Sequence, residues 1–139
     1  MRILIIDDSE LIRERLKSLI IEECPDVSIE TETRAAHALD SVRASNPDVV
    51  ILDIKMRDGS GVGVLTQIKN QPSPPIVIMF TQHPYPQFKS RCIFYGADYF
   101  LDKSTDMNDI PGIISSLKKS QRLRGHITGS QDGFRHTNL

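Results

Sequence analysis

The sequence predicts a doubly wound α/β fold, in which a five-stranded parallel sheet is covered by helices on both faces. Three observations lead to this prediction. Five short aliphatic or β-branched runs recur along the chain, segments with helical spacing fill the gaps between them, and 139 residues is the usual length of one domain. Strands that alternate with helices form parallel sheets with right-handed crossovers, so the element order alone indicates this architecture.

The first half of the chain contains the clearest helix. Between Leu11 and Glu23 the apolar side chains recur at helical spacing, and charged side chains occupy the other face. Runs rich in isoleucine and valine precede and follow this segment, as expected for strands. The predicted elements are a strand at Ile3–Ile6, a helix at Leu11–Glu23, a strand at Val27–Thr31 and a helix at Ala35–Ala44.

The second half repeats the same alternation. Helix-breaking residues separate the elements, namely Asn46-Pro47, Gln71-Pro72 and Gly96. The predicted strands are Val49–Leu52, Ile76–Phe80 and Tyr99–Leu101, and the predicted helices are Gly63–Lys69, Gln87–Tyr95 and Ile110–Lys118.

The domain is expected to span residues 1–119, followed by a flexible C-terminal tail at residues 120–139. From Ser120 onward the apolar residues are scattered without a period. A hydrophobic fraction of 39% and a charged fraction of 25% are ordinary for a globular domain, which excludes disordered and fibrous proteins. The net charge of -1 argues against direct binding of nucleic acid by this chain.

The composition also predicts a cytoplasmic protein that does not insert into a membrane. The longest apolar run, Ile76–Phe80, is far shorter than the ~20 residues that a membrane-spanning helix needs. The N-terminal aliphatic run reaches Asp7 after four residues, too soon for a secretory signal. Cys24 and Cys92 have no neighbouring cysteine, so neither a disulfide framework nor a zinc cluster is indicated.

Three acidic residues follow predicted strands. Asp7 and Asp8 follow the first strand and Asp53 follows the third. If these strands are neighbours, the three carboxylates converge at the carboxyl edge of the sheet, where ligands bind in such folds. Like charges at ~4 Å repel by several kcal/mol, so a cation is expected among them. A set of oxygen ligands favours a hard ion such as Mg²⁺.

Two further strand ends complete a predicted phosphoryl site. Thr81 follows the fourth strand with a hydroxyl, and Lys103 follows the fifth with a positive charge. A bound cation and a lysine neutralise a transferring phosphoryl group, a hydroxyl donates a hydrogen bond to it, and a carboxylate can accept it covalently.

These residues resemble the receiver domain of two-component response regulators. The resemblance rests on Asp7-Asp8, on the segment from Leu52 to Gly61, on Thr81 and on the segment from Gly96 to Ser104, in the right order over residues 2–118. The loop segments are most similar to receivers of the NarL/FixJ type. The resemblance implies a flavodoxin-like fold with the strand order 2-1-3-4-5.

The resemblance also implies a role for each site residue. Asp53 would be the phosphoacceptor, and Thr81 and Lys103 would contact the phosphoryl oxygens. Mg²⁺ would be held by Asp7, Asp8, Asp53 and the backbone carbonyl of Lys55. Thr81 and Phe100 would form the switch. Lys55, Gln82 and His83 would be modulators: Lys55 and His83 of how long the phosphoryl group persists, and Gln82 of access to the acid pocket.

Three residues depart from the family pattern. Arg57 replaces the usual proline of the loop after the phosphoacceptor, and Gln82 follows Thr81 where a small residue is common. Ser104 replaces a proline that commonly forms a cis bond, so a trans peptide bond is expected there, because a cis bond without proline costs ~2.5 to 4 kcal/mol. None of these changes removes a metal ligand.

The implied function is that of a single-domain response regulator. It would take a phosphoryl group from a sensor histidine kinase or a histidine phosphotransfer protein onto Asp53 and switch a surface for a downstream protein target; a homodimer is left open. It would not be an enzyme beyond self-catalysed phosphotransfer and slow autodephosphorylation. Two alternatives are a fragment of a longer transcriptional regulator and an interaction scaffold that is not phosphorylated.

Overall fold

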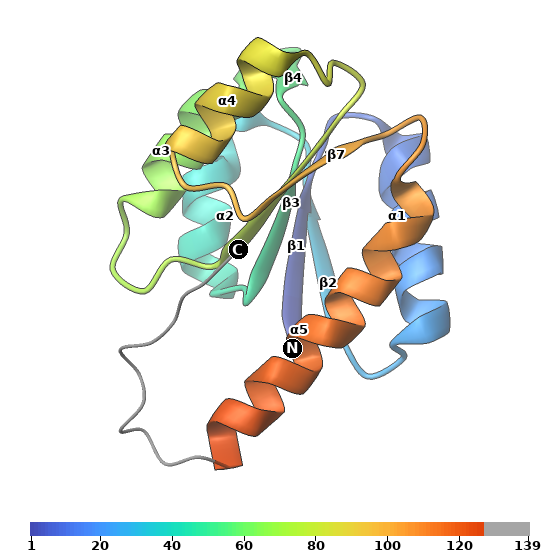
Figure 1. Ribbon diagram of the computed structural model, residues 1–139. Helices are drawn as coiled ribbons and strands as arrows, with labels where there is room; N and C mark the ends of the chain where they lie inside the picture. Colours follow the sequence, from blue (N-terminus) through green and yellow to red (C-terminus); the bar gives the residue numbers. More distant parts are fainter. Residues whose placement is uncertain (127–139) are drawn as a thin grey trace.

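Five strands form one parallel sheet in the computed structural model, which describes residues 1–126 of the chain (Figure 1). The hydrogen-bonded strands follow the order β2-β1-β3-β6-β7, which is 2-1-3-4-5 when only this sheet is counted. The predicted fold class and strand order are therefore confirmed. The strands are β1 (Arg2–Ile6), β2 (Ser28–Glu32), β3 (Val49–Leu52), β6 (Ile76–Thr81) and β7 (Tyr99–Asp102).

Helices connect successive strands. They are α1 (Glu10–Glu23), α2 (Ala38–Ser45), α3 (Gly61–Lys69), α4 (Pro86–Phe94) and α5 (Ile110–His126), and the short 3-10 helices η1 (Ala35–His37) and η2 (Met107–Asp109) precede α2 and α5. Between β3 and α3 the chain also forms a small antiparallel hairpin of β4 (Lys55–Met56) and β5 (Gly59–Ser60). Two residues per strand are too few for an alternating pattern, so the sequence did not predict this hairpin.

Both faces of the sheet are buried, each in its own hydrophobic cluster. In β1, Ile3 and Ile5 pack with α1 and α5, whereas Leu4 and Ile6 pack with α2, α3 and α4. Figure 1 shows the same division, with α1 and α5 on one side of the sheet and the other three helices on the opposite side. A strand covered on both faces must be apolar at every position, which explains the uninterrupted aliphatic runs.

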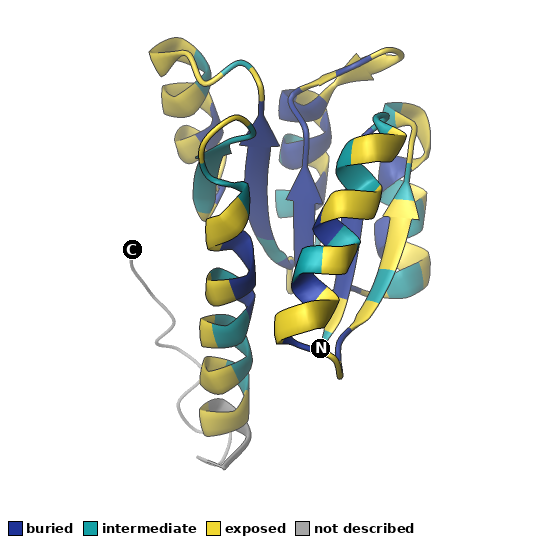
Figure 2. Cartoon of the chain, turned by 90° about the vertical axis from the view of Figure 1, so that its right-hand side faces the viewer, coloured by how far each residue is buried: buried dark blue, intermediate teal, exposed yellow. Residues whose placement is uncertain are grey.

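The last helix is longer than the sequence predicted. The predicted end was Lys118, with a flexible tail from Ser120, but α5 continues to His126. Ile114 and Leu117 pack against the core, and Gln121 donates a hydrogen bond from Nε2 to Asp48 Oδ1 at 3.0 Å. Figure 2 shows that α5 keeps a buried stripe toward the sheet while its outer face is exposed. Residues 127–139 of the predicted tail lie outside the described part.

Both cysteines lie in the described part of the chain. Cys24 and Cys92 are buried free thiols on opposite faces of the sheet, and burial raises the pKa of each thiol. Among the helices of residues 1–126, none has both the length and the apolar character needed to cross a membrane.

Candidate functional site

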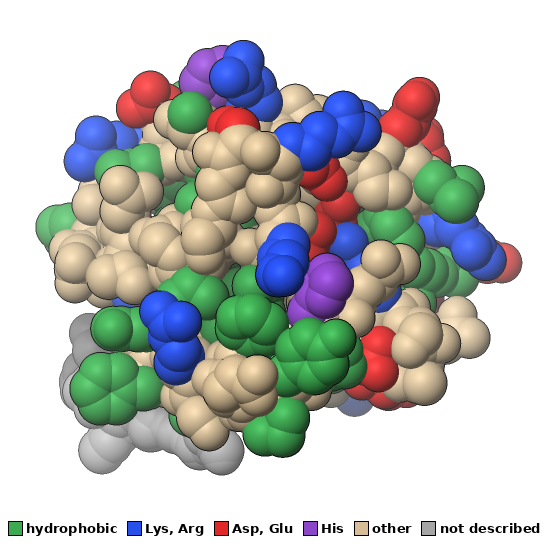
Figure 3. All heavy atoms as spheres, turned by 90° about the horizontal axis from the view of Figure 1, so that it is seen from above, with side chains coloured by type: hydrophobic (Ala, Val, Ile, Leu, Met, Phe, Trp, Pro, Cys, Tyr) green, Lys and Arg blue, Asp and Glu red, His purple; other side chains and the backbone are tan. Residues whose placement is uncertain are grey.

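The acidic residues predicted from the strand ends lie together at the carboxyl edge of the sheet. Backbone hydrogen bonds continue the strand pairing just beyond β1 and β3: Asp7 N–H donates to Glu32 O and Asp53 N–H donates to Ile6 O, both at 3.1 Å. These bonds fix Asp7 and Asp53 side by side. Seen from this end of the sheet, acidic side chains lie in a hollow bordered by basic side chains and a histidine (Figure 3).

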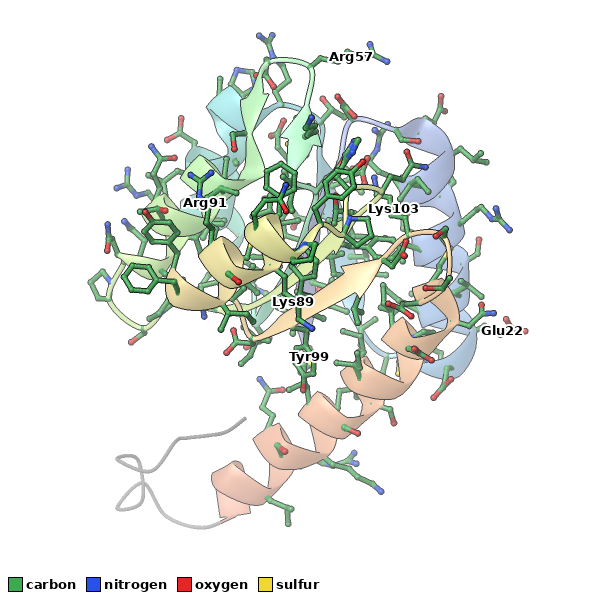
Figure 4. The ribbon with its side chains drawn as sticks, turned by 45° about the horizontal axis from the view of Figure 1, so that its top comes forward. Glu22, Arg57, Lys89, Arg91, Tyr99 and Lys103 are labelled. Atoms are coloured by element: carbon green, nitrogen blue, oxygen red, sulfur yellow. The ribbon has the colours of Figure 1, made fainter. Side chains whose placement is uncertain are left out.

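Lys103 is the central cation of the site. Its Nζ lies 2.7 Å from Asp7 Oδ2 and 3.0 Å from Asp53 Oδ2. All three side chains are at most 7% exposed, so these charges interact with little screening by water. The backbone N–H of Lys103 donates to Thr81 O at 2.9 Å, which fixes the end of β7 beside that of β6. Figure 4 shows Lys103 above the sheet, between α4 and α1.

The carboxylate of Asp53 is destabilised in the free protein. Burial raises the pKa of Asp53 above its ordinary value, and the negative charge of Asp7 raises it further, although the ammonium of Lys103 acts in the opposite direction. One lysine therefore does not fully compensate two buried carboxylates. A bound cation would add a second positive charge here and would offset the remaining free-energy cost of keeping both buried carboxylates ionised.

The geometry of the acidic cluster fits a hard divalent cation. Asp7, Asp8 and Asp53 each offer a carboxylate oxygen, and these atoms lie within 4.8 Å of one another. The donors are all oxygens, the ligand type that Mg²⁺ prefers, and Asp8 is only partly buried, which leaves room for water ligands.

Asp8 is held by the unpredicted hairpin. The backbone N–H of Arg57 donates to Asp8 Oδ2 at 2.8 Å, and Arg57 Nε lies 3.9 Å from the same oxygen. Arg57 takes the place of the family's usual proline, and the structure shows that it contacts one of the predicted metal ligands.

A cleft of about 160 Å³ opens above Asp53. It is lined by Asp8, Ser9, Ile12, Asp53, Lys55, Gln82, His83 and Lys103. The three predicted modulators therefore surround the entrance to the predicted phosphoacceptor. Among them, Lys55 is exposed and places Nζ 6.0 Å from the centroid of the Phe88 ring on α4.

The predicted switch residues lie on adjacent strands. Thr81 ends β6, is fully buried, and accepts a hydrogen bond at Oγ1 from the backbone N–H of His83 at 2.9 Å. Phe100 lies in β7, is partly buried, and packs against the cluster that includes α3 and α4. β6 and β7 are paired in parallel, so a movement at the end of β6 would act on β7 through the hydrogen bonds between the two strands.

The departure at Ser104 is accommodated by a local turn. The peptide bond between Lys103 and Ser104 is trans, as expected, like every other described bond. Ser104 donates to Asp102 Oδ1 from its backbone N–H at 2.8 Å and from its hydroxyl at 2.7 Å. These two bonds lower the pKa of Asp102 and stabilise the turn that follows Lys103.

Gly61 is a site residue that the sequence analysis missed. It is the first residue of α3, and its N–H donates to Ile54 O at 2.6 Å. A Cβ atom at this position would lie 1.8 Å from the carbonyl oxygen of Asp53. Only glycine allows the chain to return this close to the predicted phosphoacceptor. The glycine was visible in the sequence, but nothing in the pattern showed what it approaches.

A doubly wound sheet whose carboxyl edge carries an acidic cluster, a lysine and a threonine defines the receiver class of signalling domains. The chain belongs to this family: the model of the response regulator receiver domain matches residues 3–115. Receiver domains are the response-regulator modules of two-component systems, and magnesium binding and phosphorylation are general features of the family.

Two curated relatives show the extent of the similarity. The sensory transduction protein LytT of Bacillus cereus is 30% identical over 126 residues, which cover 89% of this chain and 48% of LytT. The DNA-binding transcriptional activator EvgA of Escherichia coli K12 is 29% identical over 140 residues, which cover 94% of this chain and 68% of EvgA. The chain thus spans about half the length of LytT.

Solved receiver domains have the same fold. The signal receiver domain of a DNA-binding response regulator from Colwellia psychrerythraea superposes with a TM-score of 0.80 at 26% identity, over 86% of this chain and 98% of that chain. The signal receiver domain of NarL from Mycobacterium tuberculosis gives a TM-score of 0.73 at 26% identity, over 85% of this chain and 95% of that chain. The NarL match agrees with the resemblance seen in the loops.

Proposed function

We propose that this receiver accepts a phosphoryl group on Asp53 from a sensor histidine kinase or a histidine phosphotransfer protein. The observation that carries the proposal is the contact of Lys103 with Asp53 at the floor of a cleft. Asp53 offers a nucleophilic carboxylate oxygen, and Lys103 already lies where the charge of an incoming phosphoryl group would need neutralisation.

The chemistry is a transfer between two nucleophiles. A carboxylate oxygen of Asp53 forms a bond to phosphorus as the bond from phosphorus to the donor's histidine nitrogen breaks, and that nitrogen keeps the electron pair. Lys103 then shares its protons between the phosphoryl oxygens and Asp7. The hydroxyl oxygen of Thr81 accepts from His83 N–H, so its own proton is available to a phosphoryl oxygen.

Asp7, Asp8, Asp53 and the backbone carbonyl of Lys55 are the proposed ligands of Mg²⁺. When bound, Mg²⁺ would neutralise negative charge on the carboxylates and on the phosphoryl oxygens. The chain's own contribution is to hold the acidic side chains in place: Asp7 Oδ1 accepts from Ser9 N–H at 2.9 Å, and Asp8 Oδ2 accepts from Arg57 N–H.

Phosphorylation is proposed to change an output surface through Thr81 and Phe100. A movement of the Thr81 hydroxyl toward the phosphoryl group would displace or break its bond from His83 N–H, and so move the loop between β6 and α4. Phe100 is packed beside that region, so its ring reports the change. Biasing an element between two arrangements is how such covalent switches act.

The proposal extends to partners and location. A downstream protein is the proposed target, a homodimer is compatible with the exposed apolar side chains of α4, and the cytoplasm is the proposed compartment. The acceptor chemistry is the same whether the receiver acts alone or within a longer regulator. A scaffold that is not phosphorylated is less well supported, because the acids, the threonine and the lysine are all present.

Phosphorylation of the wild-type chain by a small phosphodonor with Mg²⁺ tests the proposal. Intact-mass measurement should show one added phosphoryl group in the wild type and none in Asp53→Asn. Asp40→Asn, which removes an exposed carboxylate on α2, is the matched control and should be labelled normally. Equal labelling of Asp53→Asn and wild type would reject Asp53 as the acceptor.

A further inference from the structure

Arg57 brings a positive charge and a hydrogen-bond donor to the acidic cluster. Both contacts fall on one atom, Asp8 Oδ2, with the backbone N–H at 2.8 Å and Nε at 3.9 Å. Figure 4 shows Arg57 at the outer end of the hairpin, with its side chain reaching outward. The proline expected at this position has neither an N–H nor a charge, so a receiver with that proline could make neither contact.

The hairpin that carries Arg57 is anchored on its other side. The carboxylate of the next residue, Asp58, accepts hydrogen bonds from the backbone N–H groups of Ala35 at 2.8 Å and Ala36 at 3.1 Å. These bonds hold the pKa of Asp58 below its ordinary value. Gly59 packs so closely that a Cβ there would lie 3.0 Å from Ala35 Cβ. The backbone of Arg57 is therefore fixed beside Asp8.

We infer that Arg57 is a built-in competitor of the divalent cation at Asp8 and lowers the affinity of the acidic cluster for Mg²⁺. The inference rests on the proposed function of that cluster. A cation bound to Asp8 must share the carboxylate with the Arg57 N–H and must lie near the guanidinium of Arg57, whose backbone is held beside Asp8. Because the Arg57 side chain is 88% exposed, water and salt screen the repulsion, and the competition depends on ionic strength.

The consequence for signalling is a graded dependence on free Mg²⁺. A receiver whose Mg²⁺ site is weakened by its own arginine is phosphorylated in proportion to the fraction of sites that hold the cation. Variation in free Mg²⁺ then changes the phosphorylation rate. Tight binding would instead keep the site saturated and insensitive.

Titration of the full chain with Mg²⁺, followed by calorimetry or by amide shifts, tests the inference without any phosphotransfer. Arg57→Gln keeps the backbone N–H and removes the charge, so it should bind Mg²⁺ roughly threefold more tightly at low salt, and the gain should shrink at high salt. Arg57→Lys keeps both the N–H and the charge and should bind like the wild type. Arg91→Gln, the same change on exposed α4, should also bind like the wild type.

Each result separates the competition from other causes. Equal affinity of Arg57→Gln and wild type would overturn the inference, and an equal gain in Arg91→Gln would do the same by showing a general effect of net charge. Phosphodonor labelling at saturating Mg²⁺ should be the same in Arg91→Gln and wild type and absent in Asp53→Asn. That labelling depends on Asp53, so it reports on the proposed function independently of the competition.

Discussion

Gly61→Ala is expected to damage both the fold and the predicted phosphoacceptor. The added Cβ would lie 1.8 Å from Asp53 O and 2.8 Å from Asp53 C, whereas such contacts are essentially never closer than 3.0 Å. These are backbone atoms, so relief requires a displacement of about 1 Å in the segment that carries the acceptor. Overpacking of this kind costs about 3 kcal/mol, a large share of the ~5 to 15 kcal/mol that stabilises a typical domain.

Gly63→Ala is the matched control. It lies two residues further along α3, is exposed, and has no heavy atom within 4 Å of the position that a Cβ would take. Alanine there should raise the free energy of unfolding by up to about 1 kcal/mol, because glycine disfavours helix.

Urea unfolding and phosphodonor labelling measure the two consequences of Gly61→Ala. We expect a lower unfolding midpoint than in the Gly63→Ala control, and labelling at least about tenfold slower, since a misplacement of ~1 Å at a reacting group can cost ~10²-fold. An unfolding midpoint and a labelling rate equal to those of the wild type would refute the argument.

Three further predictions concern the charge, the switch and the lifetime of the phosphorylated state. The pKa of Asp53 is raised from its ordinary value of 3.8, so the folded state binds more protons than the unfolded state just above that pH. The stability that protonated Asp53 contributes is therefore lost as pH rises through its folded pKa. Unfolding without Mg²⁺, measured as a function of pH, should show Asp53→Asn becoming more stable relative to wild type between the ordinary pKa of Asp53 and its raised folded pKa. Thr81→Ala should still be labelled while the chemical-shift changes around Phe100 shrink; equal shifts would dismiss Thr81 as the switch. Lys55→Asn should lose its phosphoryl group faster, because a long cationic side chain at the cleft obstructs the attacking water; slower decay of the phosphorylated species would show the shielding argument to be wrong.

The elements that the sequence predicted best are the five strands of the sheet. The five strands were located to within one residue at either end. The central strands β1, β3 and β6 are buried on both faces, which demands apolar runs, whereas the edge strand β2 is largely exposed and was recognised from its β-branched residues. The end of α5 was placed too early at Lys118. Beyond that residue the helix is held by a polar contact, from Gln121 to Asp48, which apolar periodicity cannot detect.

The candidate site was predicted through its residue types but not through its contacts. Alternating elements and acids at strand ends were enough to bring Asp7, Asp8 and Asp53 together. That Lys103 pairs with Asp7 more closely than with Asp53 required the structure, since it depends on the relative ends of β1, β3 and β7. The role of Arg57 was hidden for a similar reason: it depends on a hairpin of two residues per strand.

The contacts of the free site show how the proposed phosphorylation of Asp53 would act as a switch. One ammonium is shared between two buried carboxylates, and the buried hydroxyl of Thr81 is held by the adjacent loop through His83. A phosphoryl group on Asp53 adds charge and acceptor oxygens between these groups, so Lys103 and Thr81 both gain a stronger partner than they have now. The ends of β6 and β7 carry these two residues and are joined by the bond from Lys103 N–H to Thr81 O. A change at either residue is thereby transmitted to the other, and through β7 to Phe100.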